Sequence, residues 1–287
     1  MPSFTPAELT LFLTALLAAL VNGALGYGFS SITVPVALGF VANRVLNPAL
    51  VLLELVLNLA SLFLNRRSLP AVWRRMLPLM VGLLPGVIVG GLFLTMVAAV
   101  VLKAATYAVL LPLILLQAAG VRWPIRNERT IGVPFGLGLG LLYSTTTISG
   151  PPLALLLNNQ GFAQDEFRAA IALIRVAESS LTLVTYLFLG LYGSSSLGLF
   201  WLLLPAVVIG LPLGRVLLRR VSKDAFRRLC MGVDAALVSV GLGFALQQLG
   251  WIDRAVSYAV TAAIGGFIVG SAWQRFLLLR KNQVTSS

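Results

Sequence analysis

The stretch Asn22-Gly-Ala-Leu-Gly26-Tyr-Gly28-Phe-Ser30-Ser31-Ile-Thr33-Val-Pro35 lies at the centre of an uncharged run that covers residues 9–43. This run is 35 residues long, whereas one membrane-spanning helix needs about 20 apolar residues. Gly, Ser, Thr and Pro at this density interrupt a helix. The run therefore predicts a helical hairpin or a broken pair of helices.

A second uncharged run of the same length covers residues 130–164 and has a similar centre. That centre reads Gly140-Leu-Leu-Tyr143-Ser144-Thr145-Thr146-Thr147-Ile-Ser149-Gly150-Pro151-Pro152. The same reasoning predicts a second broken or re-entrant helical hairpin.

The composition places both runs in a membrane protein. Of the 287 residues, 59% are hydrophobic and only 10% are charged, and the net charge is +12, whereas a soluble domain carries about 25% charged residues. Basic residues also suggest nucleic acid, but no nucleic-acid-binding motif accompanies them. With no histidine and one cysteine, the chain lacks the usual ligands of metal sites, histidine-based catalysis and disulfides. We therefore expect no enzyme, no metal and no cofactor.

The positions of the basic residues predict the topology. Most of them gather in four clusters, at 66–75, 122–129, 219–228 and 275–281, and basic loops tend to stay in the cytoplasm. This predicts a multi-pass protein of the cytoplasmic (inner) membrane, with its N-terminus outside and its C-terminus in the cytoplasm. Besides the two hairpins, the expected helices cover residues 46–64, 76–95, 98–119, 167–190, 197–218, 226–249 and 254–276.

The two halves of the chain resemble each other. Pro35-Val-Ala-Leu38 matches Pro152-Leu-Ala-Leu155 at a shift of 117, residues 47–58 match 168–179 at a shift of 121, and residues 82–86 match 210–214 at a shift of 128. Under the topology above, the copies enter the membrane from opposite sides, as in many secondary transporters. The predicted fold is thus an all-α polytopic membrane protein of two inverted-topology repeats, each a hairpin plus three transmembrane helices. We expect the first repeat at 1–119, a cytoplasmic linker at 120–130, the second repeat at 131–250, and an appended helix and tail at 251–287.

Short motifs at the two hairpin centres resemble the sulfite exporter TauE/SafE family over roughly residues 8–250. They are Gly23-Ala-Leu-Gly26-Tyr-Gly28 with Val34-Pro35, and Ser149-Gly150-Pro151-Pro152 with Phe167-Arg168-Ala-Ala170. The resemblance implies a multi-pass membrane protein that exports sulfite, sulfonates or similar small anions.

The hairpin centres also carry the candidate substrate-binding residues. Helix ends at a break present backbone N–H groups that attract anions, hydroxyls add donors, and glycine lets an oxyanion approach the backbone. The alternative is that these small residues only allow close helix packing. The candidates are Tyr27, Gly28, Ser30, Ser31, Thr145, Thr146, Thr147, Ser149 and Gly150.

Glu54, Arg175, Glu178 and Asp234 are ionisable residues that lie well inside expected spans, where a charge is costly. Glu54 and Arg175 are equivalent at the repeat shift of 121. They pair across the repeats, or Arg175 binds the substrate anion, or Arg175 pairs locally with Glu178 one turn away. Glu54 and Glu178 are candidates for coupling or gating, and Asp234 is expected to be structural.

Other residues are expected to have structural roles. Lys103, Arg168 and Arg215 should extend their charges toward the membrane–water interface. Gly82, Gly86, Gly90, Gly210 and Gly214 fit close helix packing without a role in substrate binding.

These features together predict a secondary transporter that exports a small oxyanion, with membrane lipid as surroundings, no nucleic-acid partner, and homo-oligomerisation left open. Three rivals remain at this stage: an anion channel of the same architecture, a non-transporting membrane scaffold, and an intramembrane enzyme. The last would need a base for Ser149, and the chain has no histidine.

Overall fold

The described part of the chain is entirely helical. The computed structural model describes residues 5–118, 128–157, 160, 162–217 and 238–253, and no strand occurs among them. The elements in chain order are α1 (Pro6–Leu25), α2 (Phe29–Ala37), α3 (Asn43–Leu64), the 3₁₀ turn η1 (Arg66–Ser68), α4 (Leu69–Met96), α5 (Ala99–Ala118), α6 (Glu128–Thr146), α7 (Gly150–Leu157), α8 (Gln164–Phe188) and α9 (Ser194–Leu217). A further helical stretch covers residues 238–248. The predicted all-α class is confirmed.

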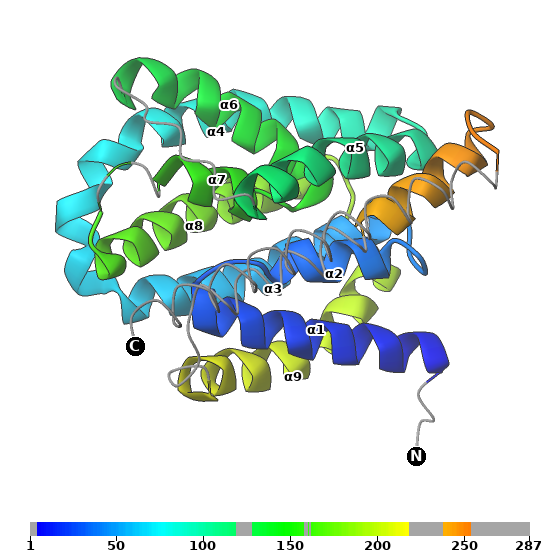
Figure 1. Ribbon diagram of the computed structural model, residues 1–287, viewed down its shortest axis with the longest axis horizontal. Helices are drawn as coiled ribbons and strands as arrows, with labels where there is room; N and C mark the ends of the chain where they lie inside the picture. The colour runs from blue at the N-terminus through cyan, green and yellow to red at the C-terminus, as the bar shows by residue number, and fades with distance from the viewer. Residues whose placement is uncertain (1–4, 119–127, 158–159, 161, 218–237, 254–287) are drawn as a thin grey trace, which may run out of the picture.

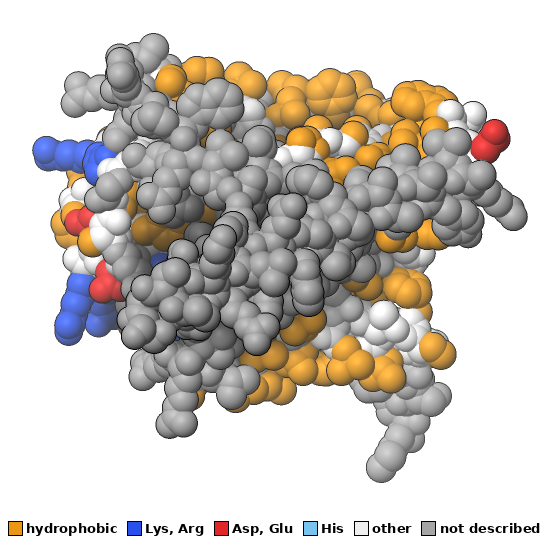
Figure 2. All heavy atoms as spheres, viewed as in Figure 1, with side chains coloured by type: hydrophobic (Ala, Val, Ile, Leu, Met, Phe, Trp, Pro, Cys, Tyr) orange, Lys and Arg blue, Asp and Glu red, His pale blue; other side chains and the backbone are white. Residues whose placement is uncertain are grey.

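Five of the described helices are long and apolar enough to cross a membrane, namely α1, α3, α4, α8 and α9. Their outward faces carry exposed large apolar side chains such as Leu17, Val81 and Trp201. Figure 2 shows hydrophobic side chains along the upper and lower parts of the described surface, with Lys and Arg side chains at the left end. Arg66, Arg67, Arg74 and Arg75 are exposed. Such a surface suits lipid rather than water, and the chain is a multi-pass membrane protein.

Both long uncharged runs are interrupted near their centres. α1 ends at Leu25 and α2 begins at Phe29, while α6 ends at Thr146 and α7 begins at Gly150. At 1.5 Å per residue, the nine residues of α2 and the eight of α7 extend only about 13 Å, less than half of a bilayer core of about 30 Å. Each run is therefore one long helix followed by a half-length helix.

Left-handed backbone marks both interruptions, which we call the first break (residues 26–28) and the second break (residues 147–149). Gly26 and Gly28 have φ of 87° and 105°, and Thr147 has φ of 58°. Glycine adopts these angles without steric cost, whereas threonine does so only under strain. Proline does not cause the breaks, because Pro35 lies inside α2 and the Pro151-Pro152 pair lies in the first turn of α7, where proline fits.

Two predicted boundaries are wrong. α4 begins at Leu69 instead of residue 76, so Arg74 and Arg75 belong to its first turns instead of a loop. Their guanidinium groups lie over the rings of Trp73 and Phe162, which lets a charged turn continue an apolar helix. α6 begins at Glu128, inside the stretch predicted as a linker. Asp234, most of the predicted helix 226–249 and the helix 254–276 lie outside the described residues.

Glycines bring two pairs of long helices into close contact. α4 packs along α6, and α1 packs along α9 (Figure 1). A Cβ on Gly86 of α4 would lie 2.2 Å from the Leu137 carbonyl oxygen of α6. A Cβ on Gly214 of α9 would lie 2.0 Å from the Leu20 carbonyl oxygen of α1. Close backbone approach of this kind drives helix association in lipid. The other glycines that were expected to pack in this way, Gly82, Gly90 and Gly210, also lack room for a Cβ.

Two glycines of α6 give a matched test of this packing. A Cβ on Gly136 would lie 2.1 Å from the Leu79 carbonyl oxygen, whereas Gly138 has no atom within 4 Å of that position. We predict that Gly136→Ala lowers the melting temperature in detergent, because overpacking costs about 1–3 kcal/mol. Gly138→Ala should leave it unchanged or raise it slightly, since alanine favours helix. Equal melting temperatures for the two variants would contradict the described α4–α6 contact.

Candidate functional site

The centre of the protein contains a buried ion pair. Arg175 of α8 and Glu54 of α3 are each 1% exposed, and Arg175 Nη2 donates to Glu54 Oε1. Both residues lie in the middle of helices of membrane-spanning length. Of the alternatives for Arg175, the structure contains the pair between the two halves of the chain. Glu178, in contrast, accepts from Ser149.

A serine from each break donates to one of the two buried glutamates. Ser30, at the start of α2, donates to Glu54 Oε1 over 2.6 Å. Ser149, just before α7, donates to Glu178 Oε2 over 2.5 Å. All four side chains are buried. The two half-length helices are thereby held to the two central helices, α3 and α8, at their charged positions.

The two breaks meet next to Arg175. A Cβ on Gly150 would lie 2.9 Å from Arg175 Nη1 and 3.5 Å from Tyr27 Cβ. Glycine at position 150 therefore leaves the guanidinium close to the backbone at the start of α7. The structure thus brings Tyr27, Gly28, Ser30, Ser149, Gly150, Arg175, Glu54 and Glu178 into one region.

The threonine hydroxyls at and just before the second break donate to backbone carbonyls. Thr145 Oγ1 donates to the Leu141 carbonyl, and Thr146 Oγ1 donates to the Leu142 carbonyl. Thr147 is fully buried and its hydroxyl donates to the neighbouring backbone. Threonine often bonds its own helix in this way. The described state uses these hydroxyl protons within the protein, and binding of an anion by these three threonines stays a prediction.

The two breaks differ in the number of backbone N–H donors that they offer. The first turn of α2 offers N–H groups that have no partner within the helix, and Ser31 lies there, almost buried. The start of α7 offers fewer, because Pro151 and Pro152 have no N–H. The first break is therefore the richer source of backbone donors for an anion, and the second supplies the close approach at Gly150.

Sequence reasoning missed a polar group beside the ion pair. Asn58 Nδ2 donates to Ser179 Oγ over 3.4 Å, and the Tyr143 hydroxyl lies 2.8 Å from the same oxygen. Asn58 and Ser179 are 121 residues apart, which is the repeat shift, and this spacing is the signal by which sequence reasoning could have found them. Two further side chains cap the end of α6: Asn47 donates to the Thr145 carbonyl over 2.6 Å, and Tyr186 to the Ser144 carbonyl.

Two cations that were expected at the interface bind helix ends instead. Lys103 Nζ donates to the Leu38 carbonyl over 2.6 Å at the end of α2, and Arg168 Nη2 donates to the Ala24 carbonyl over 2.9 Å at the end of α1. A cation at a helix C-terminus is stabilised by the helix dipole. Carbonyls that a full-length helix would satisfy itself therefore gain partners where α1 and α2 stop.

The central charges retain hydrogen-bonding capacity. Arg175 Nε, Glu54 Oε2 and Glu178 Oε1 are buried without a hydrogen-bond partner. Buried polar atoms normally have one. Among the described residues, no group of three or more His, Cys, Asp or Glu side chains is arranged to hold a metal ion. A guanidinium with an N–H that has no hydrogen-bond partner, next to a glycine break, suits binding of a small oxyanion.

A double-mutant cycle tests the ion pair. We predict that Arg175→Met strongly lowers the melting temperature, because removing one partner of a buried pair costs about 3–5 kcal/mol. Adding Glu54→Leu should restore most of the loss, since apolar residues replace a buried pair at little cost. Differential scanning fluorimetry in detergent measures both effects. Strictly additive losses would mean that the two side chains do not interact.

Comparison with known proteins identifies the family of the chain. The family model described as "Sulfite exporter TauE/SafE" matches residues 11–242, which include both breaks and the ion pair. No curated protein and no solved structure matches the chain. The matched region is most of the 287 residues. The chain therefore belongs to the sulfite exporter TauE/SafE family, whose members are membrane transporters and not enzymes.

Proposed function

We propose that this protein is a secondary transporter that exports a small oxyanion, such as sulfite or an organosulfonate, across the cytoplasmic membrane. The observation that carries the proposal is the position of Arg175, buried in mid-membrane between two helix breaks and within reach of the backbone at Gly150. An intramembrane charge marks a substrate pathway more often than a structural element.

The transporter consists of two inverted-topology repeats around an axis that passes between α3 and α8. Equivalent residues of two repeats can touch only beside the axis that relates them. Glu54 contacts Arg175 and Asn58 contacts Ser179, and both pairs are 121 residues apart. The paired contacts of α4 with α6 and of α9 with α1, each through glycines, also support this symmetry.

The orientation follows from the basic end of the molecule. The exposed cluster of Arg66, Arg67, Arg74 and Arg75 lies at the turn between α3 and α4, and such clusters remain in the cytoplasm. The N-terminus then lies outside and the C-terminus in the cytoplasm.

Substrate binding exchanges one anion for another at Arg175. One oxygen of the Glu54 carboxylate accepts from Arg175 Nη2 in the described state, and a sulfite or sulfonate oxygen pair can accept from two donors of an arginine at once. A substrate that displaces Glu54 keeps Arg175 neutralised, so the cost of an unpaired buried cation is avoided. A proton taken up by the displaced Glu54 would couple proton entry to anion exit. Glu178, held by Ser149 of the second break, is the counterpart that gates this break.

Proton coupling is not required by the energetics of export. An inside-negative potential contributes about 2.3 kcal/mol per elementary charge per 100 mV. At 1.4 kcal/mol per factor of ten, a monoanion is expelled about fifty-fold per 100 mV. The potential therefore drives export, and the exchange at Glu54 decides which anions pass.

Burial of the central residues favours alternating access over an open channel. Arg175, Glu54, Ser30 and Ser149 are all less than 2% exposed. A conducting pore would need water at these positions, whereas a transporter passes through a state in which the site is closed on both sides. Movement of one repeat against the other would open the breaks to each side in turn.

Transport in proteoliposomes tests the proposal. We predict saturable sulfite efflux with counterflow, and loss of that efflux in Arg175→Ala, which removes the anion ligand, and in Gly150→Leu, whose side chain would collide with Arg175. Gly138→Leu is the matched control, because it introduces the same side chain at an exposed position of α6. Full flux in both Arg175→Ala and Gly150→Leu would contradict the site, and flux without saturation or counterflow would indicate a channel.

A further inference from the structure

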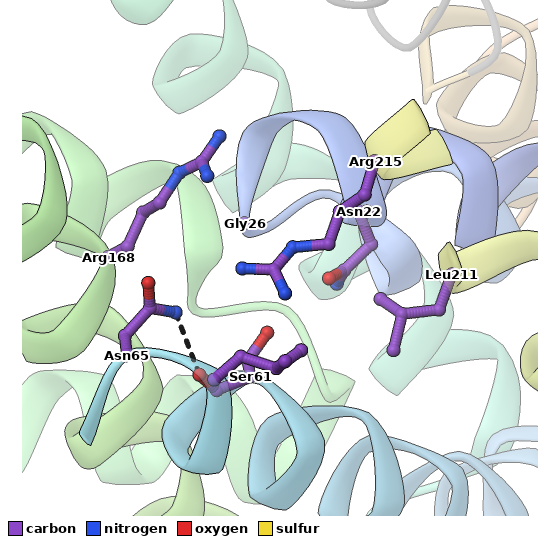
Figure 3. A pocket seen from close by; sticks show the side chains of 9 residues that line it. Asn22, Gly26, Ser61, Asn65, Arg168, Leu211 and Arg215 are labelled. Carbon is purple, nitrogen blue, oxygen red and sulfur yellow. Dashed lines mark hydrogen bonds between the residues drawn. The ribbon is translucent and has the colours of Figure 1, made fainter. Parts of the chain in front are cut away.

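A polar pocket separate from the central site lies at the basic end of the molecule, where α1, α3, α8 and α9 come together. Its lining includes Asn22 and Gly26 at the end of α1, Ser61 and Asn65 at the end of α3, Arg168 of α8 and Arg215 of α9 (Figure 3). Asn65 is followed directly by the exposed Arg66 and Arg67. Under the proposed orientation, the pocket is at the cytoplasmic side.

The pocket is strongly basic. Two guanidinium groups line it, and none of its described lining residues is acidic. In Figure 3, Arg215 extends its guanidinium toward Gly26, and Arg168 lies on the opposite side with its guanidinium directed away from Arg215. Arg168 gives one donor to the Ala24 carbonyl, but a guanidinium has five N–H donors. The Asn22 side chain, almost fully buried, adds an amide. Two arginines with an amide are a donor set that suits an oxyanion.

This pocket and the central site share one wall, the first break. Gly26 lines the pocket, while a Cβ on Gly150 would lie 3.5 Å from Cβ of the next residue, Tyr27, and 2.9 Å from Arg175 Nη1. Both Gly26 and Gly28 have left-handed backbone, so Tyr27 lies between two residues that have no side chain. A change of backbone angles at these glycines would move the wall without steric cost.

We propose that the Arg168–Arg215 pocket is a second oxyanion site, which captures the exported sulfite or sulfonate from the cytoplasm and passes it through the first break to Arg175. This inference rests on the proposed function for the direction and identity of the cargo. Binding itself depends only on the two arginines and the pocket. Positive charge at the mouth of a pathway raises the local concentration of anions and their rate of entry.

Thiol accessibility measures binding without transport. Ser61→Cys, in a Cys230→Ser background, places a single thiol in the pocket. An anionic methanethiosulfonate reagent is applied to the full-length protein in phosphatidylcholine nanodiscs, with and without inorganic sulfate, which does not react with thiols. We expect sulfate to slow modification severalfold. Arg168→Gln or Arg215→Gln should remove the protection, while Arg67→Gln, which deletes an exposed charge from the same end, should retain it.

Three outcomes of the accessibility experiment would overturn the second site. The first is the absence of protection by sulfate, and the second is protection that persists in the Arg168→Gln, Arg215→Gln double variant. The third is protection of the thiol by phosphatidylglycerol in the nanodiscs with which sulfate does not compete, because the pocket would then be a lipid headgroup site.

Kinetics of sulfite efflux separate this proposal from the central one. Arg215→Gln should raise the half-saturating sulfite concentration on the cytoplasmic side about tenfold, because one charge-assisted hydrogen bond is lost, and should retain the maximal rate. Arg67→Gln should change neither value. Failure of the wild-type protein to transport sulfite would contradict the proposed function but not sulfate protection of the thiol, whereas unchanged half-saturation in Arg215→Gln would contradict the capture role alone.

Discussion

The buried pair of Arg175 and Glu54 is the interaction on which the rest of the structure depends. An isolated charge in the bilayer core is costly, about 2.5–3.5 kcal/mol on insertion scales, so the loss of either residue destabilises the protein. Their contact fixes where α3 crosses α8. Because Ser30 donates to Glu54 and Ser149 donates to Glu178, the two central helices also fix the positions of both half-length helices.

Breaking a helix inside a membrane exposes backbone groups that lipid cannot satisfy, and the protein supplies partners from neighbouring helices. Asn47 and Tyr186 donate hydrogen bonds to backbone carbonyls at the end of α6, and Lys103 donates one to a carbonyl at the end of α2. Glycines bring the long helices α4 and α6, and α1 and α9, close enough to enclose these polar groups. The glycine contacts therefore enclose the polar centre and keep it away from lipid. The proposed site for an oxyanion lies where the breaks, the serines and the arginine come together.

Much of this arrangement could be predicted from the sequence, but which groups its side chains bond to could not. The length and composition of the two uncharged runs were enough to predict the breaks, and the repeat shift of 121 identified Glu54 and Arg175 as equivalent. Sequence could not decide whether Arg175 pairs with Glu54 or with Glu178, because α8 itself places Glu178 one turn away and only the crossing with α3 selects between them. The Thr145–Thr147 hydroxyls were assigned to the substrate, since nothing in a sequence tells whether threonine donates to a ligand or to its own helix. The start of α4 was misplaced because the turn carrying Arg74 and Arg75 was taken for a loop.

The exchange of Glu54 for substrate at Arg175 is tested most directly by anion binding to Glu54→Gln. Glutamine preserves the size of the side chain and removes the competing charge, so sulfite and methanesulfonate should bind more tightly to the variant than to the wild-type protein. Ligand-dependent thermal stabilisation across a concentration series measures this difference. Tighter binding in Glu54→Gln, together with no stabilisation in Arg175→Gln, is the result this account predicts. Equal or weaker binding in Glu54→Gln would contradict it, because the carboxylate would then not occupy the substrate's place.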